Sequence, residues 1–389
     1  MAAEPTTLDI LARLIGFATL SRQPNRDLIG YVTGLLDRAG VGWDLVESPD
    51  GTRANLLATI GPATGSGVVL SGHTDVVPVE GQAWSTDPFR LHEQDGRYYG
   101  RGTADMKGFV AAALAAALYA ARRDLKTPLH LAFSYDEEIG CVGVRSLIER
   151  LATSPIRPAL CIVGEPTGMR IATGHKGKVA LRACCTGRAG HSALAPTALN
   201  ALHLGADFLG RLRARQRDLA ETGRRDDQYE IPYTTLHAGR MRGGQALNIV
   251  PECCEIEFEI RNVAGDDPQA IIANLKGDAE AIVAPLRPAF PEAAIAIDEV
   301  NAYPGLETPM DSPVVALLRL ITQSREPAFK VAFGTEGGLF QDRLGLATAV
   351  CGPGFMTQGH KPDEYVSADQ LGRCDAMLAA LVDRLAVGL

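Results

Sequence analysis

The sequence lacks two features that would assign it to particular classes of protein. It has no block of basic residues, and its 38 Lys and Arg are outnumbered by 46 Asp and Glu, giving a formal net charge of −8. This balance argues against binding nucleic acid through its phosphates. The longest apolar run, residues 109–121, is well short of the ~20 residues that a helix needs to span a membrane. We therefore expect neither nucleic acid nor a membrane as a partner.

Cysteines with the spacing of a metal site are also missing. The eight cysteines include the adjacent pairs Cys184–Cys185 and Cys253–Cys254 but no C-x-x-C motif. Adjacent cysteines are poorly placed to bind one zinc ion together, and a chain of this size has little need for disulfides. The N-terminal segment Met1–Pro5 has no basic residue and contains the acidic Glu4. Both features argue against a signal peptide. We expect reduced thiols and a cytoplasmic location.

The length of the chain and the order of its predicted elements indicate two domains. At 389 residues the chain exceeds what one core usually organises. In residues 1–176 and 301–389, strand-like and helix-like patterns alternate, which predicts an α/β domain with a mixed sheet between helices. Residues 177–300 follow the order βαββαβ, including a helix expected at Ala195–Arg215. That order predicts a ferredoxin-like domain inserted into the larger one.

Several polar residues follow predicted strands or lie in a loop that leads to the next helix. They are His73, Asp105, Glu137, Glu138 and Glu165. In open α/β sheets, functional groups gather at the carboxyl ends of the strands. We therefore expect these side chains to meet at one edge of the sheet.

Taken singly, each motif has an ordinary alternative. A tripeptide such as His73–Asp75 occurs often by chance, and Asp105 is equally typical of a helix N-cap. Residues 136–138 alone fit a solvated acidic loop, and a histidine in a glycine-rich loop, such as His360, is more often a surface residue. Against the solvated loop, the residues after Glu138 are largely apolar, and buried adjacent acids repel unless cations offset them.

Together these residues form a ligand set for two divalent ions. Three carboxylates and two neutral imidazoles, completed by a hydroxide, balance four positive charges. Nitrogen and oxygen ligands without thiolates suit zinc, with cobalt or manganese as alternatives. One of the adjacent Glu137 and Glu138 would bind metal while its neighbour serves as general base. Asp75 would orient the His73 ring.

The chain resembles the dinuclear zinc amidohydrolases of the M20 metallopeptidase family along nearly its whole length. The resemblance rests on the following motifs: Ser-Gly-His-Thr-Asp-Val-Val-Pro at 71–78, the stretch from Asp95 to Gly108, Asp-Glu-Glu at 136–138, Gly-Glu-Pro-Thr at 164–167, Gly-His-Ser at 190–192 and Gly-His-Lys-Pro-Asp-Glu-Tyr at 359–365. As a set they are highly specific.

The resemblance implies a role for each motif residue. One metal would be held by His73, Asp105 and Glu165, and the other by Asp105, Glu138 and His360. Glu137 would be the general base, with Asp75 as the partner of His73. In the inserted domain, His191 would stabilise the oxyanion, often across a dimer, while Asn248 and Arg261 would bind the carboxylate of the substrate. The inserted domain would act as a lid and as the contact of a homodimer.

The resemblance also implies a small N-acyl amino acid as substrate. Within the family it favours hydrolysis of N2-acetyl-L-ornithine to L-ornithine and acetate, a reaction of arginine biosynthesis. Glu336 would lie near the cationic end or the acyl group of that substrate, although a surface acid in a loop is nearly as good an interpretation. The alternatives are desuccinylation of diaminopimelate, a general aminoacylase or a dipeptidase, and a non-catalytic metal-binding relative. A phosphoesterase is disfavoured because no cluster of Arg or Lys accompanies the motifs.

Overall fold

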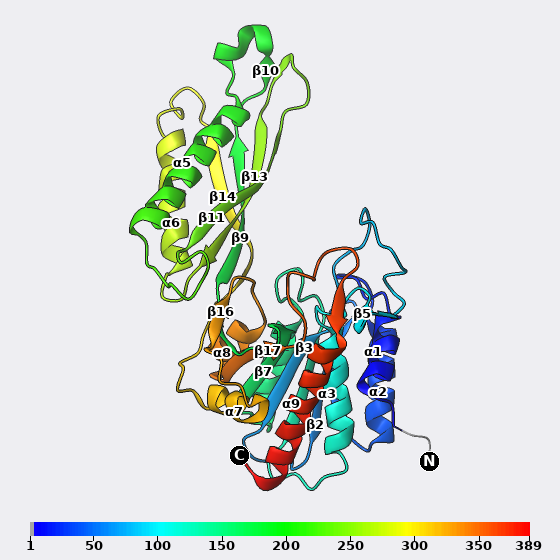
Figure 1. Ribbon diagram of the computed structural model, residues 1–389. Coiled ribbons are helices and arrows are strands. Elements are labelled where there is room, and N and C mark those ends of the chain that lie inside the picture. Colours follow the sequence, from blue (N-terminus) through cyan, green and yellow to red (C-terminus); the bar gives the residue numbers. More distant parts are fainter. Residues whose placement is uncertain (1–3) are drawn as a thin grey trace. The chain divides into compact units, whose positions relative to one another are not determined.

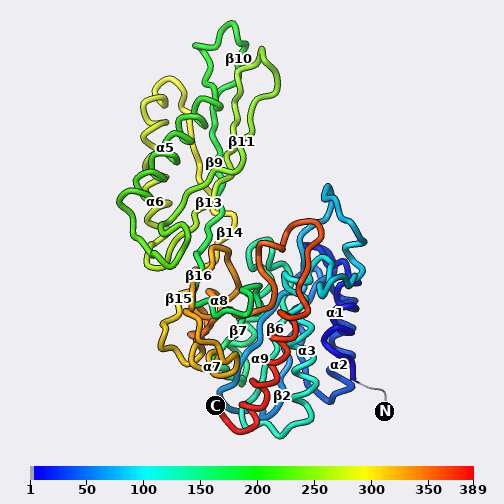
Figure 2. Tube along the Cα trace, viewed as in Figure 1, coloured from blue at the N-terminus to red at the C-terminus, as the bar shows by residue number. Residues whose placement is uncertain are grey.

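The computed structural model describes residues 4–389 of the chain, which divides into two compact units. Unit 1 comprises Met1–His175 and Leu306–Leu389, and unit 2 comprises Lys176–Gly305 (Figure 1). The trace in Figure 2 shows the first and the last segments of the chain within unit 1 and the middle segment forming unit 2. The segment 177–300 that the sequence predicts as an inserted domain lies within unit 2.

Unit 1 is built around a nine-stranded mixed sheet. Its strands are β1 Gly42–Glu47, β2 Ala54–Ile60, β3 Val68–His73, β6 Leu129–Ser134, β7 Leu160–Pro166, β8 Ala172–His175, β15 Leu306–Glu307, β16 Phe329–Val331 and β17 Ala347–Gly352. They run in the order β1-β2-β6-β3-β7-β17-β8-β15, with β16 paired to β8. The central strands β6, β3, β7 and β17 are parallel, so their carboxyl ends meet at one edge of the sheet.

Helices cover both faces of this sheet (Figure 1). They are α1 Thr7–Ile15, α2 Arg26–Arg38, α3 Lys107–Ala120, α4 Val144–Thr153, α7 Pro313–Thr322, α8 Gly337–Leu344 and α9 Ala368–Val387. The Ala-rich α3 is buried on almost every side because it packs between the sheet, α1 and α9. Alternate residues of the strands, such as Val68 and Leu70, share the core with α3. The helices α4 and α8 contact each other on the other face.

A three-stranded sheet in unit 1 brings two distant loops together. It consists of β4 His92–Gln94, β5 Arg97–Tyr99 and β18 Tyr365–Ser367, in the order β18-β5-β4. β5 leads into the turn that carries Asp105, and β18 follows the loop that carries His360. Pairing of these two strands therefore anchors both loops at the same place. Within residues 4–389, no helix has both the length and the apolar character required to cross a membrane.

Unit 2 has the predicted ferredoxin-like fold. Its main elements are β9 Gly177–Thr186, α5 Ala201–Thr222, β11 Thr235–Gly243, β13 Cys253–Asn262, α6 Pro268–Val283 and β14 Ala294–Tyr303. The strands pair antiparallel in the order β11-β13-β9-β14, and α5 and α6 pack together against this sheet. The short strands β10 Gly190–His191 and β12 Ile249–Val250 pair separately. The α/β architecture with an inserted βαββαβ unit is thus confirmed.

The helix expected at Ala195–Arg215 is wrong at its start. A 3-10 helix, Ser192–Thr197, is followed by an extended residue, Asn200, and α5 begins only at Ala201. The Asn200 side chain accepts a hydrogen bond from the backbone N–H of Leu202 at 2.9 Å and caps the helix. Pro196 lacks the N–H that a continuous helix would need. The helix α8, within a segment read as a loop, was not foreseen.

Packing of β7 against α3 generates a prediction about Gly164. A Cβ atom at this position would lie 1.9 Å from the Phe109 ring of α3. Because interior packing is dense, we expect Gly164→Ala to lower the free energy of unfolding by about 1–3 kcal/mol. Gly372→Ala on the exposed side of α9 is the control, since a Cβ there meets nothing within 4 Å. Urea unfolding of both variants measures the difference, and equal stabilities would contradict the packing argument.

Candidate metal centre

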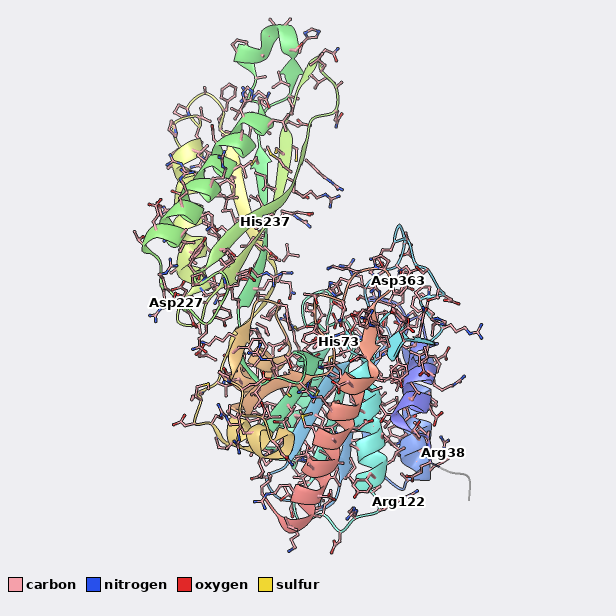
Figure 3. The ribbon with its side chains drawn as sticks, viewed as in Figure 1. Arg38, His73, Arg122, Asp227, His237 and Asp363 are labelled. Atoms are coloured by element: carbon pink, nitrogen blue, oxygen red, sulfur yellow. The ribbon has the colours of Figure 1, made fainter. Side chains whose placement is uncertain are left out.

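The structure brings the predicted ligand residues together at the carboxyl edge of the central strands. His73 is the last residue of β3, Glu165 lies near the end of β7, and Glu138 follows β6. Asp105 precedes α3, and His360 lies in the loop between β17 and β18. All are at least largely buried except His360, whose side chain is 49% exposed. Figure 3 shows His73 at this edge of unit 1.

Asp105 lies between the two imidazoles. Its Oδ1 is 3.1 Å from Nε2 of His73, and its Oδ2 is 3.2 Å from Nε2 of His360. The remaining carboxylates lie on either side: Glu165 Oε1 is 3.7 Å from His73 Nε2, and Glu138 Oε2 is 3.0 Å from His360 Nε2. One carboxylate that presents each oxygen to a separate cluster of ligands has the arrangement of a bridging ligand.

The tautomer of His73 follows from its hydrogen bonds. Nδ1 lies 2.9 Å from the main-chain oxygen of Asp75. A carbonyl can only accept, so Nδ1 carries the proton and donates. In the neutral ring Nε2 then presents a lone pair toward the carboxylates of Asp105 and Glu165. Lone pairs facing one another favour a cation between them, which is how metal-ligating histidines are usually oriented.

Asp75 contacts the His73 ring through its main-chain oxygen. Its carboxylate, 3.6 Å from His73 Nδ1, instead accepts the backbone N–H of Glu137 at 3.0 Å and of Glu138 at 3.4 Å. The hydroxyl of Ser21 donates to it at 2.8 Å. Asp75 therefore also holds the loop that carries the adjacent acids.

The surroundings of the three glutamates of the site disfavour their charged form. Burial, together with neighbouring carboxylates, raises the pKa of Glu137 to about 8 and that of Glu138 to about 7. Burial and the adjacent Asp105 raise the pKa of Glu165 well above its ordinary range. Hydrogen bonds to Asp105 and Glu138 raise the pKa of His360 to about 10. Each shift has the sign expected where negative charge exceeds the positive charge that the protein itself provides.

These residues fit two divalent cations. Ligand atoms of His73, Asp105 and Glu138 lie within 4.8 Å of one another, as do those of His73, Glu137 and Glu165. Within residues 4–389, Oε1 of Glu138 is buried and has no hydrogen-bond partner. A buried unpaired carboxylate oxygen is costly unless a cation binds it. The chemistry of the donors, oxygen and nitrogen without thiolate, suits zinc and related ions.

The adjacent acids differ in their partners. Glu138 contacts His360. Glu137 Oε1 accepts a hydrogen bond from the Cys141 thiol at 3.2 Å. Glu138 is thus joined to the second histidine, whereas Glu137 lies with His73 and Glu165.

The residues predicted in the inserted domain all lie in unit 2, and the structure brings only two of them together. His191 in β10 is exposed, and its Nδ1 accepts the backbone N–H of Ala193. Asn248 lies beside it, because its main-chain oxygen accepts the N–H of Ser192 at 3.1 Å. Arg261 lies at the other end of β13, where it donates to Glu259 at 3.0 Å and to the Tyr303 hydroxyl at 3.1 Å.

Glu336 is not a surface acid. It lies just before α8 and is 1% exposed. The hydroxyl of Ser71 in β3 donates to its Oε2 at 2.8 Å, and the hydroxyl of Ser134 in β6 donates to its Oε1. Burial raises the pKa of Glu336 despite these bonds. Its carboxylate is thus held by the two strands that carry His73 and lead to Glu137, and a direct contact with substrate remains a prediction.

Sequence reasoning missed a buried ion pair that supports the site. Oε1 of Glu364 accepts the backbone N–H groups of Gly102, Ala104 and Asp105, and Oε2 accepts Nη1 of Arg101 at 2.6 Å. Arg101 and Glu364 are both 1% exposed. Arg101 and Glu364 both lie inside the family motifs at 95–108 and 359–365, which marked them as possible site residues. A sequence does not show, however, which residues of a motif face inward.

The raised pKa values predict how the metal-free protein responds to pH. Glu137 and Glu138 bind protons in the folded state up to about pH 8 and 7, but release them near 4.5 when unfolded. The folded state then holds more protons, so the free energy of unfolding should fall between pH 5.5 and 8.5. Urea unfolding of chelated protein tests this, and a stability that stays level or rises would contradict it. Glu138→Gln should flatten the decline, whereas Glu149→Gln on the exposed side of α4 should not.

Comparison with known proteins places this site in a family. The family model described as peptidase family M20/M25/M40 matches residues 69–384. The chain is 33% identical to acetylornithine deacetylase of Pasteurella multocida over 395 aligned positions, covering 99% of each chain. It is also 33% identical to acetylornithine deacetylase of Klebsiella pneumoniae, covering 93% of each.

Solved structures share the fold. An M20 family metallo-carboxypeptidase of Sulfolobus solfataricus superposes with a TM-score of 0.80 at 19% identity, covering 99% of this chain and 100% of that one. The YXEP protein of Bacillus subtilis, described as a dinuclear metal-binding peptidase of the M20 family, has a TM-score of 0.69 at 14% identity, covering 97% and 96%. The sequence match over most of the chain, together with the clustered ligands, shows that this protein belongs to peptidase family M20/M25/M40 and is a hydrolase of that family.

Proposed function

We propose that the protein hydrolyses the acetyl amide of N2-acetyl-L-ornithine, using two divalent ions, most simply zinc. The observation that carries the hydrolytic part is the Asp105 carboxylate, which presents one oxygen toward His73 and the other toward His360. The relatives named as acetylornithine deacetylases support the choice of substrate.

In this proposal the side chains divide into those that hold the ions, one that transfers the proton and one that supports them. His73, Asp105 and Glu165 hold one ion, and Asp105, Glu138 and His360 hold the other. When bound, such ions lower the pKa of water to about 7 and polarise the carbonyl that is attacked. Glu137 removes the proton of the attacking water at its carboxylate and later delivers it to the leaving amine. Asp75 supports both halves of the site, since it fixes the His73 ring and the backbone of Glu137.

The environment of Glu137 suits a residue that must take up and return a proton. Burial raises its pKa to about 8 in the metal-free protein. Bound cations would lower this value by favouring the carboxylate form. A carboxyl whose pKa is brought near the working pH in this way transfers protons efficiently in both directions.

We also propose that the inserted unit carries the contact of a homodimer, through which His191 would serve the partner's site. Exposed large apolar side chains on the paired strands β10 and β12 and on the segments beside them support this. They include Leu194, Leu247 and Ile249. A cytoplasmic location is part of the same proposal.

The role of Glu137 is tested by Glu137→Gln. Because the amide keeps the shape but not the basicity of the carboxylate, we expect kcat to fall by about 10²–10⁴-fold while two ions still bind. Metal content by mass spectrometry and turnover of N2-acetyl-L-ornithine measure the two effects. Glu149→Gln, the same change on the exposed side of α4, should match wild type. Near-normal turnover of Glu137→Gln would remove the residue from the role of base.

The substrate is tested by kcat/KM values for a panel of acyl-amino acids, with and without chelator. We expect N2-acetyl-L-ornithine to exceed N-succinyl-diaminopimelate, neutral N-acetyl-amino acids and dipeptides. If Glu336 pairs with the cationic end of the substrate, Glu336→Gln should reduce the preference for ornithine over neutral side chains. An unchanged preference would refute that pairing, and a preference for another substrate would replace the proposed one.

A further inference from the structure

We infer that Gln82 is a positioning residue for the metal centre, because it fixes the loop that carries His360. The inference rests on the proposed function, in which His360 is a ligand. Gln82 itself does not reach the ligands. It acts on the main chain of His360 and links it to the buried pair that holds Asp105, one of the two candidate ligands that contact this histidine.

The loop of His360 needs such support because packing does not provide it. The His360 side chain is 49% exposed, whereas the side chain of Asp105 opposite it is 4% exposed. His360 and Asp363 both have positive φ, 61° and 55°, a conformation that residues other than glycine seldom adopt. Hydrogen bonds from neighbouring segments must therefore define where the imidazole lies.

The hydrogen bonds of Gln82 determine how its amide is oriented. Nη2 of Arg101 lies 2.6 Å from Oε1, and the indole nitrogen of Trp84 lies 3.0 Å from the same atom. Guanidinium and indole nitrogens only donate, so the atom that faces them is the amide oxygen. Nε2 then points the other way and donates to the main-chain oxygen of His360 at 3.1 Å. Turning the amide by 180°, which would swap its oxygen and nitrogen, would therefore break these hydrogen bonds.

The other end of this series of contacts is buried. Arg101 is 1% exposed, and its Nη1 donates to Glu364, the carboxylate that accepts the backbone N–H of Asp105. Arg101 also stacks on the Trp84 ring, with its guanidinium carbon 5.1 Å from the centroid. Gln82 thus connects the His360 loop to the same ion pair that sets the Asp105 turn.

A second contact joins the segment of Gln82 to the loop of His360. Because this contact attaches the loop independently, the effect of Gln82 can be distinguished from attachment of the loop as a whole. The backbone N–H and the hydroxyl of Ser85 donate to the two carboxylate oxygens of Asp363, each at 2.8 Å. Figure 3 labels Asp363 in unit 1. With this contact and the bond from Arg101 Nη1 to the main-chain oxygen of Lys361 intact, loss of the Gln82 bond leaves the loop attached and removes only the hydrogen bond at His360.

The sharpest test is Gln82→Glu. The carboxylate still accepts from Arg101 and Trp84, but it offers no N–H to the His360 carbonyl and repels that oxygen. Partners that orient metal ligands typically contribute 10–100-fold to metal affinity. We expect the variant to bind one Co²⁺ as wild type does and the second about 10–100-fold more weakly, with a changed visible absorption band. Titration of chelated protein, followed by absorption and calorimetry, measures both.

Gln94→Glu on the exposed strand β4 is the matched control and should bind both ions as wild type does. Wild-type binding of both ions by Gln82→Glu, with an unchanged spectrum, would overturn the inference. If Gln82→Glu lowers the unfolding midpoint of the metal-free protein, Gln82→Ala decides: weaker binding of the second ion supports the inference, and normal binding of both overturns it. Failure of wild type itself to bind two ions would instead refute the proposed function.

Discussion

The structure of the site depends on keeping several carboxylates close together in a buried place. Asp105, Glu137, Glu138 and Glu165 surround His73 at the end of the sheet, and burial raises the pKa of the three glutamates. Buried like charges are unfavourable in isolation, so the arrangement requires compensating cations. Burying several carboxylates together is unfavourable for the protein alone. The same closely spaced carboxylates make the site suited to binding divalent ions.

The rest of unit 1 holds these acids in place against their repulsion. Asp75 accepts backbone N–H groups of the acidic loop, and Glu364 accepts those of the Asp105 turn. Each supporting carboxylate is itself paired, Glu364 with Arg101 and Asp75 with Ser21. The ligands thus belong to a framework of main-chain contacts, in which the positions of the side chains follow from the positions of the loops.

Part of this could be read from local patterns. The βαββαβ order of residues 177–300 appears as predicted, because short apolar patterns bounded by turns leave few alternatives. The helix expected at Ala195–Arg215 was misplaced because Asn200 caps a new helix where the apolar pattern continues. Glu336 was weighed as a surface acid because nothing near it in the sequence indicates that Ser71 and Ser134 meet it.

The sequence by itself determined the fold class and the family and predicted the candidate ligands, since each depends on residue types within short motifs. Only the tertiary structure decided which oxygen of Asp105 faces which histidine and how Asp75 bonds His73. It alone also shows that Gln82 reaches the main chain of His360. These contacts join residues up to 278 positions apart, and their geometry arises from strand order and loop packing, which no local pattern encodes.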